Sequence, residues 1–429
     1  MTTSSIGYLA LLRRNRPFRR LWYGQIVSQL GDWFASIALF TLLLRLTGSG
    51  QAVGLLLVAE LLPATLVGLW AGVLVDRLPR KAVLIAADVG RALLVLLFLL
   101  VHDAGDIWIV YAATVLKVVL ASFFEPARSA VVPVLTARAE LVAANAISGA
   151  TWSAMLAIGA ALGGLVAGTL GAETAFVIDA ASFLLSAAII WRIPIREEHL
   201  EARVATGGAQ DLAEGLGFLA RRRDVALYAL TKALWSMGGG VLVLLTLFGR
   251  QVFPLGEDGA LSIGLLYAAR GVGAAIGPLL AQRLGGSSVR FLRRMLGPAI
   301  LCTGLGYALV SAAPSLPLAA LAVVLAHMGG STQWVYSTVL LQMSVPNRLL
   351  GRVFAVELAL LTLTTAASSY ITGLLADAAW DPRTLAAAMA LVFVPPGVGL
   401  LALLWREPVI GLAQSAPLGG GAGAEGPRE

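Results

Sequence analysis

The sequence has little of what water-soluble enzymes and metalloproteins rely on. Its 429 residues include one cysteine, three histidines and 13% charged side chains. The single cysteine, Cys302, excludes an intrachain disulfide and a cysteine metal cluster. The histidines are too scattered for metal-ligand spacing, and there is no lysine-containing phosphate-binding loop. We therefore expect no metal, no cofactor and no enzymatic activity.

Apolar residues dominate the composition of the chain. Hydrophobic side chains account for 58% of the chain, and the mean hydropathy is +0.85. A soluble domain does not bury that much apolar surface, so the class is an all-α membrane protein. The apolar runs predict twelve transmembrane helices, near 21–44, 52–75, 82–101, 107–127, 141–169, 174–191, 225–249, 260–282, 294–313, 317–342, 350–376 and 384–405.

The loop charges set the expected orientation. Of the 31 Lys and Arg residues, 24 lie in the two termini and the alternate loops on their side, and three lie in the opposite loops. This bias predicts that both termini are cytoplasmic. It also explains the net charge of +7, so we expect a lipid bilayer and no nucleic acid as partner.

One long polar connection divides the spans six and six. We expect a cytoplasmic basic N-terminus, an N-terminal six-helix half, a cytoplasmic linker, a C-terminal half and a disordered tail, at 1–20, 21–191, 192–224, 225–405 and 406–429. The halves also repeat weakly, since 129–147 aligns without gaps on 337–355. This agrees with two six-helix pseudo-symmetric halves.

A short polar turn joins the second and third spans. It reads Gly72-Val-Leu-Val-Asp76-Arg77-Leu-Pro-Arg80-Lys81. The alternative is an ordinary basic loop, but the spacing resembles the G-x-x-x-D-R-x-G-R-R signature of the major facilitator superfamily, with Pro79 at a position where that family usually has Gly. The resemblance implies that Asp76 meets the start of span 11, at Gly351 and Arg352, when the cytoplasmic side is shut.

Further stretches resemble the drug–proton antiporter branch that includes macrolide exporters and the enterobactin exporter. They are 18–32, 123–133 and 351–355. Span 5 carries Gly159, Gly163 and Gly164, similar to the antiporter motif G-P-x-x-G-G with Ala160 in place of Pro. Small residues there allow spans 5 and 8 to pack closely. The resemblance implies that spans 1, 4, 7 and 10 line a central cavity.

Charges inside the apolar spans are the candidate coupling or substrate residues, because each is costly in hydrocarbon. They are Asp32, Glu60, Lys117, Arg270 and Glu357. Asp32 lies midway along span 1, where it can exchange a proton, attract a cation or cap a neighbouring helix. Lys117 suits an anionic substrate or a partner for Asp32 or Glu60. Glu357 can pair with a cation or carry protons.

Two further cations receive structural interpretations. Lys232 lies near the cytoplasmic end of span 7 and is expected to extend towards the membrane surface. Arg91 lies three residues after Asp88 on span 3, and the two are expected to pair locally.

Large side chains near the presumed cavity favour an apolar or amphipathic ligand over a sugar. The cavity-lining candidates are Trp33, Trp235, Met237, Gln333, Trp334 and Tyr336, although aromatic residues are also frequent at lipid-facing positions.

The sequence thus predicts a secondary active transporter of the bacterial inner membrane. We expect it to export amphipathic small molecules, drug-like, macrolide-like or siderophore-like, in exchange for protons, as a monomer. A lipid or lysolipid flippase of the same fold is one alternative, and a membrane sensor or scaffold that does not transport is another.

Overall fold

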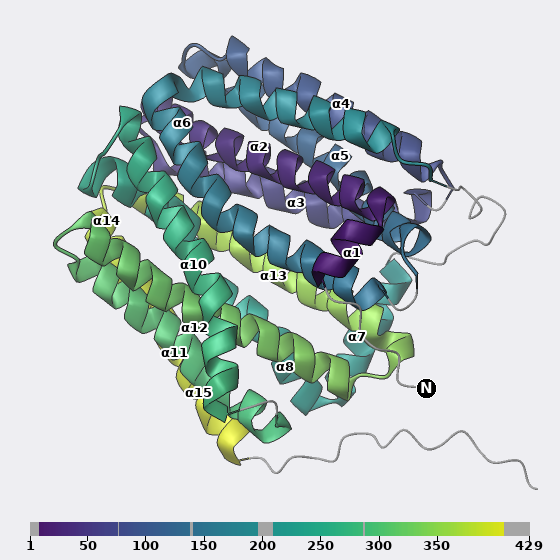
Figure 1. Cartoon of the computed structure of the whole chain (residues 1–429). Coiled ribbons are helices and arrows are strands. Elements are labelled where there is room, and N and C mark those ends of the chain that lie inside the picture. Colours follow the sequence, from purple (N-terminus) through teal and green to yellow (C-terminus); the bar gives the residue numbers. More distant parts are fainter. Residues whose placement is uncertain (1–7, 76, 138–139, 196–208, 286–287, 407–429) are drawn as a thin grey trace, which may run out of the picture.

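The computed structural model describes residues 8–75, 77–137, 140–195, 209–285 and 288–406. These residues are almost entirely helical, and none of them lies in a β-strand. The helices form two bundles, the first drawn in purple to teal and the second in teal through green to yellow (Figure 1). The fold is therefore the expected all-α one with two helical halves.

The N-terminal half contains five long helices preceded by a short one. They are α1 (Tyr8–Arg14), α2 (Arg16–Thr47), α3 (Gly50–Val75), α4 (Arg80–Leu96), α5 (Ile107–Leu135) and α6 (Leu141–Trp191), with 3-10 turns η1 (Leu97–Leu100) and η2 (Ala104–Asp106). The α2 helix starts where Asn15 accepts a hydrogen bond from the Phe18 backbone N–H at 3.0 Å. It ends at Gly48, whose φ of 66° is the left-handed conformation that glycine adopts without strain.

Eleven segments of the described chain are long and apolar enough to cross a membrane. One of them, Ala143–Trp191, has 49 residues, about 74 Å of helix against an apolar layer of about 30 Å. Gly171 interrupts it with φ 84° and ψ 164°. This segment therefore contains spans 5 and 6, and the eleven segments correspond to the twelve predicted crossings.

The C-terminal half is more interrupted. Its elements are α7 (Ala209–Arg221), α8 (Arg223–Ser236), α9 (Val241–Leu247), the π-turn η4 (Phe248–Val252), η5 (Glu257–Gly259), α10 (Ala260–Gly285), α11 (Val289–Ala312), α12 (Leu316–Ser344), α13 (Asn347–Asp377), α14 (Pro382–Val392) and α15 (Val394–Arg406). The spans predicted at 225–249 and 384–405 match the candidate membrane spans Arg223–Val252 and Pro382–Trp405, but each contains an interruption of its helix. The first breaks over Met237–Gly240, where three consecutive glycines weaken the helix, and the second breaks at Phe393.

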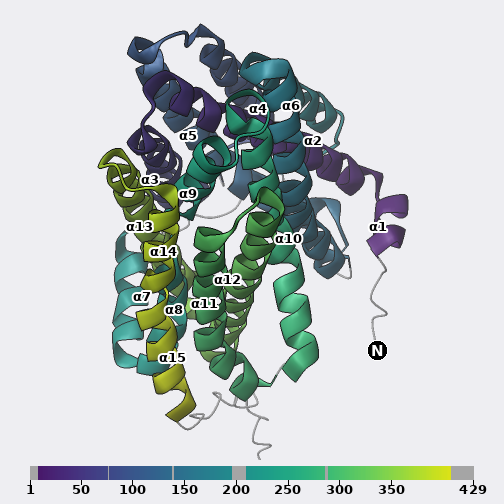
Figure 2. The same ribbon diagram turned by 90° about the vertical axis from the view of Figure 1, so that its left-hand side faces the viewer.

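The two halves contact each other through two helix pairs, α3 with α13 and α6 with α10 (Figure 2). The contacts include the end of the bundle opposite the termini. There, Asp377 accepts hydrogen bonds from the Ser49 hydroxyl at 2.5 Å and the Gly50 N–H at 2.6 Å. Arg45 also lies 3.4 Å from Glu257 of the other half.

Glycine makes the α6–α10 contact possible. A Cβ at Gly164 would lie 2.7 Å from both the Ala260 carbonyl oxygen and the Gly264 Cα. Gly159 and Gly163, by contrast, face α2 within their own half, against the backbone and ring of Trp33. Of the three predicted packing glycines, Gly164 therefore brings the halves together.

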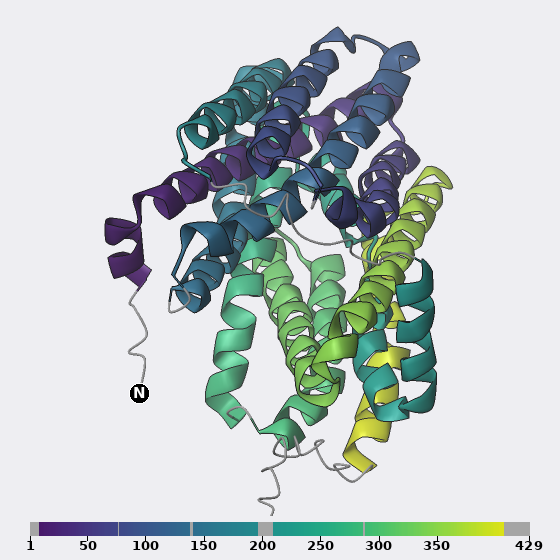
Figure 3. The same ribbon diagram turned by 90° about the vertical axis from the view of Figure 1, so that its right-hand side faces the viewer.

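Nearer the termini the interface helices have open space. Among the described residues, a Cβ at Gly149 of α6 or Gly351 of α13 would have no atom of another element within 4 Å. Leu279 and Leu284 of α10 are 62% and 80% exposed. Figure 3, from the side opposite to Figure 2, shows the two bundles running in different directions with α1 projecting from the first.

Candidate functional site

A cavity of about 720 Å³ lies within the N-terminal half. Every residue lining it belongs to α2, α3, α4, α5 or α6. Lys117 and Arg128 both line it, and Arg128 is eleven positions further along α5, so the cavity extends about 16 Å along that helix. Its lining includes seven charged or amide side chains besides these two, namely Gln25, Gln29, Asp32, Glu60, Arg91, Glu125 and Asn145.

An ion pair between spans 1 and 4 lies in the cavity wall. The Lys117 Nζ donates to Asp32 Oδ1 at 3.0 Å. The Asp32 side chain is 37% exposed, whereas Lys117 is 12% exposed. The carboxylate can therefore meet water or a ligand, while the ammonium is held behind it. Lys117 is thus a partner of Asp32, which was one of the interpretations of this lysine from the sequence.

Glu60 of α3 lines the same cavity. Within the described part of the chain it forms no ion pair. It is therefore a second, unpaired carboxylate in the cavity that also contains Asp32 and Lys117. The predicted residues of spans 1, 2 and 4 are thus brought to one site. A carboxylate pair with one ammonium can exchange protons or bind a cation.

Arg91 of α4 is held in place from several sides. It forms a hydrogen-bonded ion pair with Asp88, as the spacing indicated. Its guanidinium also lies 4.5 Å from the Phe124 ring centre and 4.3 Å from that of Phe183. Because Arg91 is fixed between two rings and a carboxylate, we regard it as a rigid part of the cavity wall.

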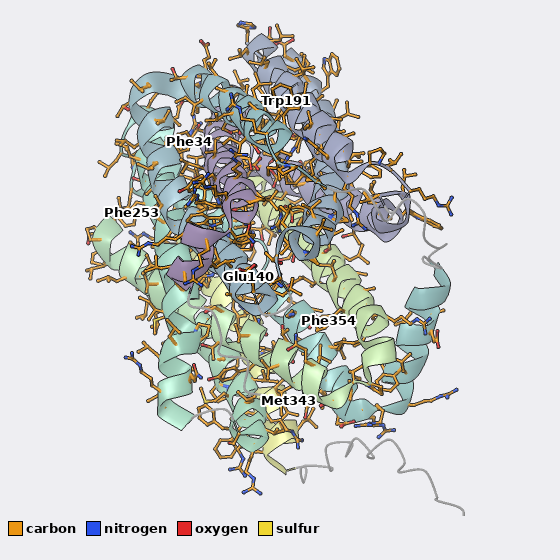
Figure 4. The ribbon with its side chains drawn as sticks, turned by 45° about the vertical axis from the view of Figure 1, so that its right-hand side comes forward. Phe34, Glu140, Trp191, Phe253, Met343 and Phe354 are labelled. Atoms are coloured by element: carbon orange, nitrogen blue, oxygen red, sulfur yellow. The ribbon has the colours of Figure 1, made fainter. Side chains whose placement is uncertain are left out.

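Polar contacts also mark the end of the cavity nearer the termini. Arg128 pairs with Glu125 at 2.8 Å and donates to the Gln25 side chain at 3.3 Å. Asn15, at the start of α2, donates to Glu140 at 3.1 Å, and Glu140 is labelled in Figure 4. These bonds tie α2 to α5 and to the start of α6.

Sequence reasoning missed Asp179, the carboxylate of span 6. It is fully buried, and its Oδ1 would lie 2.5 Å from a Cβ at Gly31, the residue before Asp32. Its Oδ2 has no hydrogen-bond partner among the described residues. The available signal was a lone charge inside the apolar run 174–191, the same signal that identified Asp32.

In the C-terminal half, Lys232 and Glu357 form a buried ion pair. Lys232 Nζ lies 3.0 Å from Glu357 Oε2 and 2.9 Å from Thr338 Oγ1, and the two charged side chains are 6% and 4% exposed. The Trp334 ring centre lies 4.6 Å from the same ammonium. The expectation that Lys232 extends to the membrane surface is wrong, because its partner on span 11 holds it inside.

The other predicted residues of this half lie outside the 720 Å³ cavity. Trp235 packs edge-on against Trp334, while Gln333 and Tyr336 are buried. Met237 lines a separate apolar cavity of about 330 Å³. Arg270 forms no ion pair among the described residues and lies close to the buried phenols of Tyr267 and Tyr307. Trp33 is thus the one predicted cavity-lining residue that the structure places in the main cavity.

The residues predicted to form the cytoplasmic gate lie in or near α3, α4 and α13. Asp76 lies outside the described residues, and Gly72 falls within α3. Arg77 is exposed, Arg80 donates to the Ala130 carbonyl at 3.3 Å, and Lys81 donates to the Ile193 carbonyl at 2.9 Å. Arg352 forms an ion pair with Glu214 of α7. The contact of Asp76 with span 11 stays a prediction.

Comparison with known proteins supplies the family. The model of the Major Facilitator Superfamily matches residues 21–356. Macrolide efflux protein A of Streptococcus pyogenes is 25% identical over 84% of this chain and 89% of its own length. The multidrug efflux pump Tap of Mycobacterium bovis is 27% identical over 89% of this chain and 92% of its own.

Two further similarities cover either half of the chain or the fold alone. An uncharacterized transporter of this type, YfiS of Bacillus subtilis, is 30% identical over 49% of this chain, and the match spans about half of YfiS. The crystal structure of the nucleoside transporter NupG superposes with a TM-score of 0.69 at 11% identity, covering 92% of this chain and 100% of that one, which shows the fold alone. The helical architecture, the intramembrane charges and the family match agree, and the chain belongs to the Major Facilitator Superfamily as a multi-pass transporter with efflux-type relatives and no enzymatic role.

Proposed function

We propose that this protein exports amphipathic small molecules from the cytoplasm in exchange for protons. It would act as a monomer in the bacterial inner membrane by alternating access. The observation that carries the proposal is the cavity of about 720 Å³ in which the partly exposed Asp32 pairs with Lys117.

The expected orientation supports the proposed direction of transport. The loop charges predict cytoplasmic termini, and the halves touch at the opposite end through Asp377 and Arg45. A cavity that extends from Lys117 towards the termini would then receive its ligand from the cytoplasm. The efflux functions named for macrolide efflux protein A and for Tap support the same direction.

The coupling step needs a group that holds either a proton or a ligand. Asp32 meets this requirement, because its carboxylate is exposed to the cavity and its charge is balanced by an ammonium 3.0 Å away. Glu60 offers a second carboxylate in the same cavity. When Asp32 is protonated, a cationic amphipath that reaches it would displace the proton, and return of a proton from outside would release the ligand.

The test uses purified protein in liposomes that enclose a pH-sensitive dye. Erythromycin, which is a macrolide amine, and tetraphenylphosphonium are added as probes. We expect ligand-dependent proton movement with the wild-type protein and its loss with Asp32→Asn. Proton movement that survives in Asp32→Asn would move the coupling to Glu60, and its absence for a broad set of ligands with the wild-type protein would refute proton-coupled export.

A lipid or lysolipid flippase is the second candidate. The apolar cavity of about 330 Å³ in the C-terminal half favours it, since Met237, Ile371 and Met389 line it together with the hydroxyls of Thr364 and Ser368. A fluorescent lysolipid in the same liposomes provides the measurement. Redistribution of this lipid without any drug-dependent proton movement would support the flippase.

A further inference from the structure

We propose that Asp179 is the second acceptor of the Lys117 ammonium, which passes from Asp32 to Asp179 when Asp32 takes up a proton or a cationic ligand. Asp179 is thus a positioning residue, because it would act on Asp32 through Lys117. The inference rests on the proposed function for its role in transport, but the charge movement itself can be tested without a substrate.

The first observation is the depth of the three groups. Asp32 lies at the cavity wall with 37% exposure, Lys117 is 12% exposed, and Asp179 is fully buried and does not line the cavity. The lysine is therefore intermediate in exposure between a carboxylate that can exchange with the cavity and one that cannot.

The second observation is the incomplete bonding of Asp179. Its Oδ1 receives a hydrogen bond from Ser182 at a long 3.4 Å, and its Oδ2 has no partner in the part of the chain that the structure describes. A buried carboxyl group with a free oxygen is stabilised by a nearby positive charge, by an added donor or by taking up a proton. The two cations whose charges act on it are Lys117, more strongly, and Arg91.

Of these two cations, only Lys117 is free to move. Arg91 is bound to Asp88 and enclosed by two phenyl rings. Lys117 has a flexible stem, and its ammonium already lies 6.0 Å from the ring centre of Phe183, one turn beyond Asp179 on α6. A rotation of the lysine side chain is the change that would supply Asp179 with its missing donor.

The third observation is the missing side chain at Gly31. A Cβ there would lie 2.1 Å from the Ser182 hydroxyl and 2.5 Å from Asp179 Oδ1. Glycine at this position therefore lets Asp179 approach the backbone of α2 directly beside Asp32. The spans bring four other titratable groups to the cavity, namely Asp32 on α2, Glu60 on α3, Arg91 on α4 and Lys117 on α5, and Asp88 pairs with Arg91 behind it.

The physical reason for a second acceptor is the cost of an unpaired ammonium. When Asp32 is neutralised, Lys117 remains in a place with little access to water. Removing one partner of a largely buried ion pair is strongly unfavourable if the other charge stays uncompensated. Movement of the ammonium to Asp179 keeps it paired and frees Asp32 for its proton or ligand.

A structure of the Asp32→Asn variant, which mimics protonated Asp32, tests the movement directly. We expect Lys117 Nζ within hydrogen-bond distance of Asp179 Oδ2. Lys117 still directed at residue 32, at Glu60 or into the open cavity would overturn the proposal.

Thermal unfolding of purified protein tests it independently, through a double-mutant cycle. Asp32→Asn and Asp179→Asn should each lower Tm slightly, because Lys117 keeps one carboxylate in either case. The double variant should lose more than the sum of the two, and adding Lys117→Gln should restore Tm. Additive losses, or no recovery with Lys117→Gln, would overturn the proposal.

Ser182→Ala is the matched control, since it removes the neighbouring hydroxyl and keeps the Asp179 charge. It should leave the cycle unchanged. Because unfolding needs no substrate, failure of this cycle is distinguishable from failure of the proposed export, which would appear as absent ligand-dependent proton movement in wild-type liposomes.

Discussion

Replacement of Glu357 by methionine should destabilise the C-terminal half strongly. The variant leaves the Lys232 ammonium, 6% exposed, without its carboxylate 3.0 Å away. Breaking a buried pair in this way costs about 3–5 kcal/mol. Lys232 keeps Thr338 at 2.9 Å and the Trp334 ring at 4.6 Å, and the ring contact contributes about 0.5–2 kcal/mol. We therefore expect a loss near the lower limit, about 3 kcal/mol.

The assay is unfolding of the purified protein in mixed detergent, followed by circular dichroism. The double variant Lys232→Met/Glu357→Met should be close to the wild type, because a buried pair replaced by apolar side chains of similar size is often neutral. Glu257→Gln is the control at an exposed pair with Arg45, where the loss should stay below about 1 kcal/mol. A Glu357→Met loss as small as that of the control, or a double variant as unstable as the single one, would refute the reasoning.

The same double variant separates the two interpretations of Glu357. If the pair only holds spans 7 and 11 together, the stable double variant should keep ligand-dependent proton movement. If Glu357 carries protons, as the sequence allowed, that movement should be lost even though the protein is folded.

Three further predictions concern the contact between the halves and the helix ends. Gly164→Ala places a Cβ 2.7 Å from backbone atoms of the other half, so it should separate the halves and increase labelling of cysteines introduced at that end, whereas Gly149→Ala, with open space, should not. Asp381→Ala removes the side chain that caps two N–H groups of α14 and should cost about 1 kcal/mol in the same unfolding assay. Glu214→Gln breaks the exposed pair between α7 and Arg352 and should change stability by less than about 1 kcal/mol, so a larger loss would show that α7 is more tightly bound than its exposure indicates.

Much of the fold could be predicted from the sequence, because apolar runs and alternating loop charges depend on local composition. The site was accessible in part. A charge in the middle of an apolar span signals a function wherever it occurs, which was sufficient for Asp32 and Lys117. Asp179 is also a lone charge within an apolar span, but it was not among the predicted site residues.

Pairing between distant spans was less predictable. Lys232 and Glu357 are 125 residues apart, and their contact depends on how spans 7 and 11 are rotated. Hydropathy does not determine that rotation, so the lysine was placed at the membrane surface. The helix breaks near Met237 and Phe393 were missed for a related reason, since apolar composition measures the length of a span and not its continuity.

The central claim is that a ligand and a proton compete for Asp32. The most direct measurement is proton release when tetraphenylphosphonium binds to purified protein in a weakly buffered detergent solution. At a pH at which Asp32 is protonated before the ligand binds, we expect release in proportion to bound ligand with the wild-type protein and none with Asp32→Asn. Ligand binding without proton release by the wild-type protein, or equal release by both proteins, would contradict it.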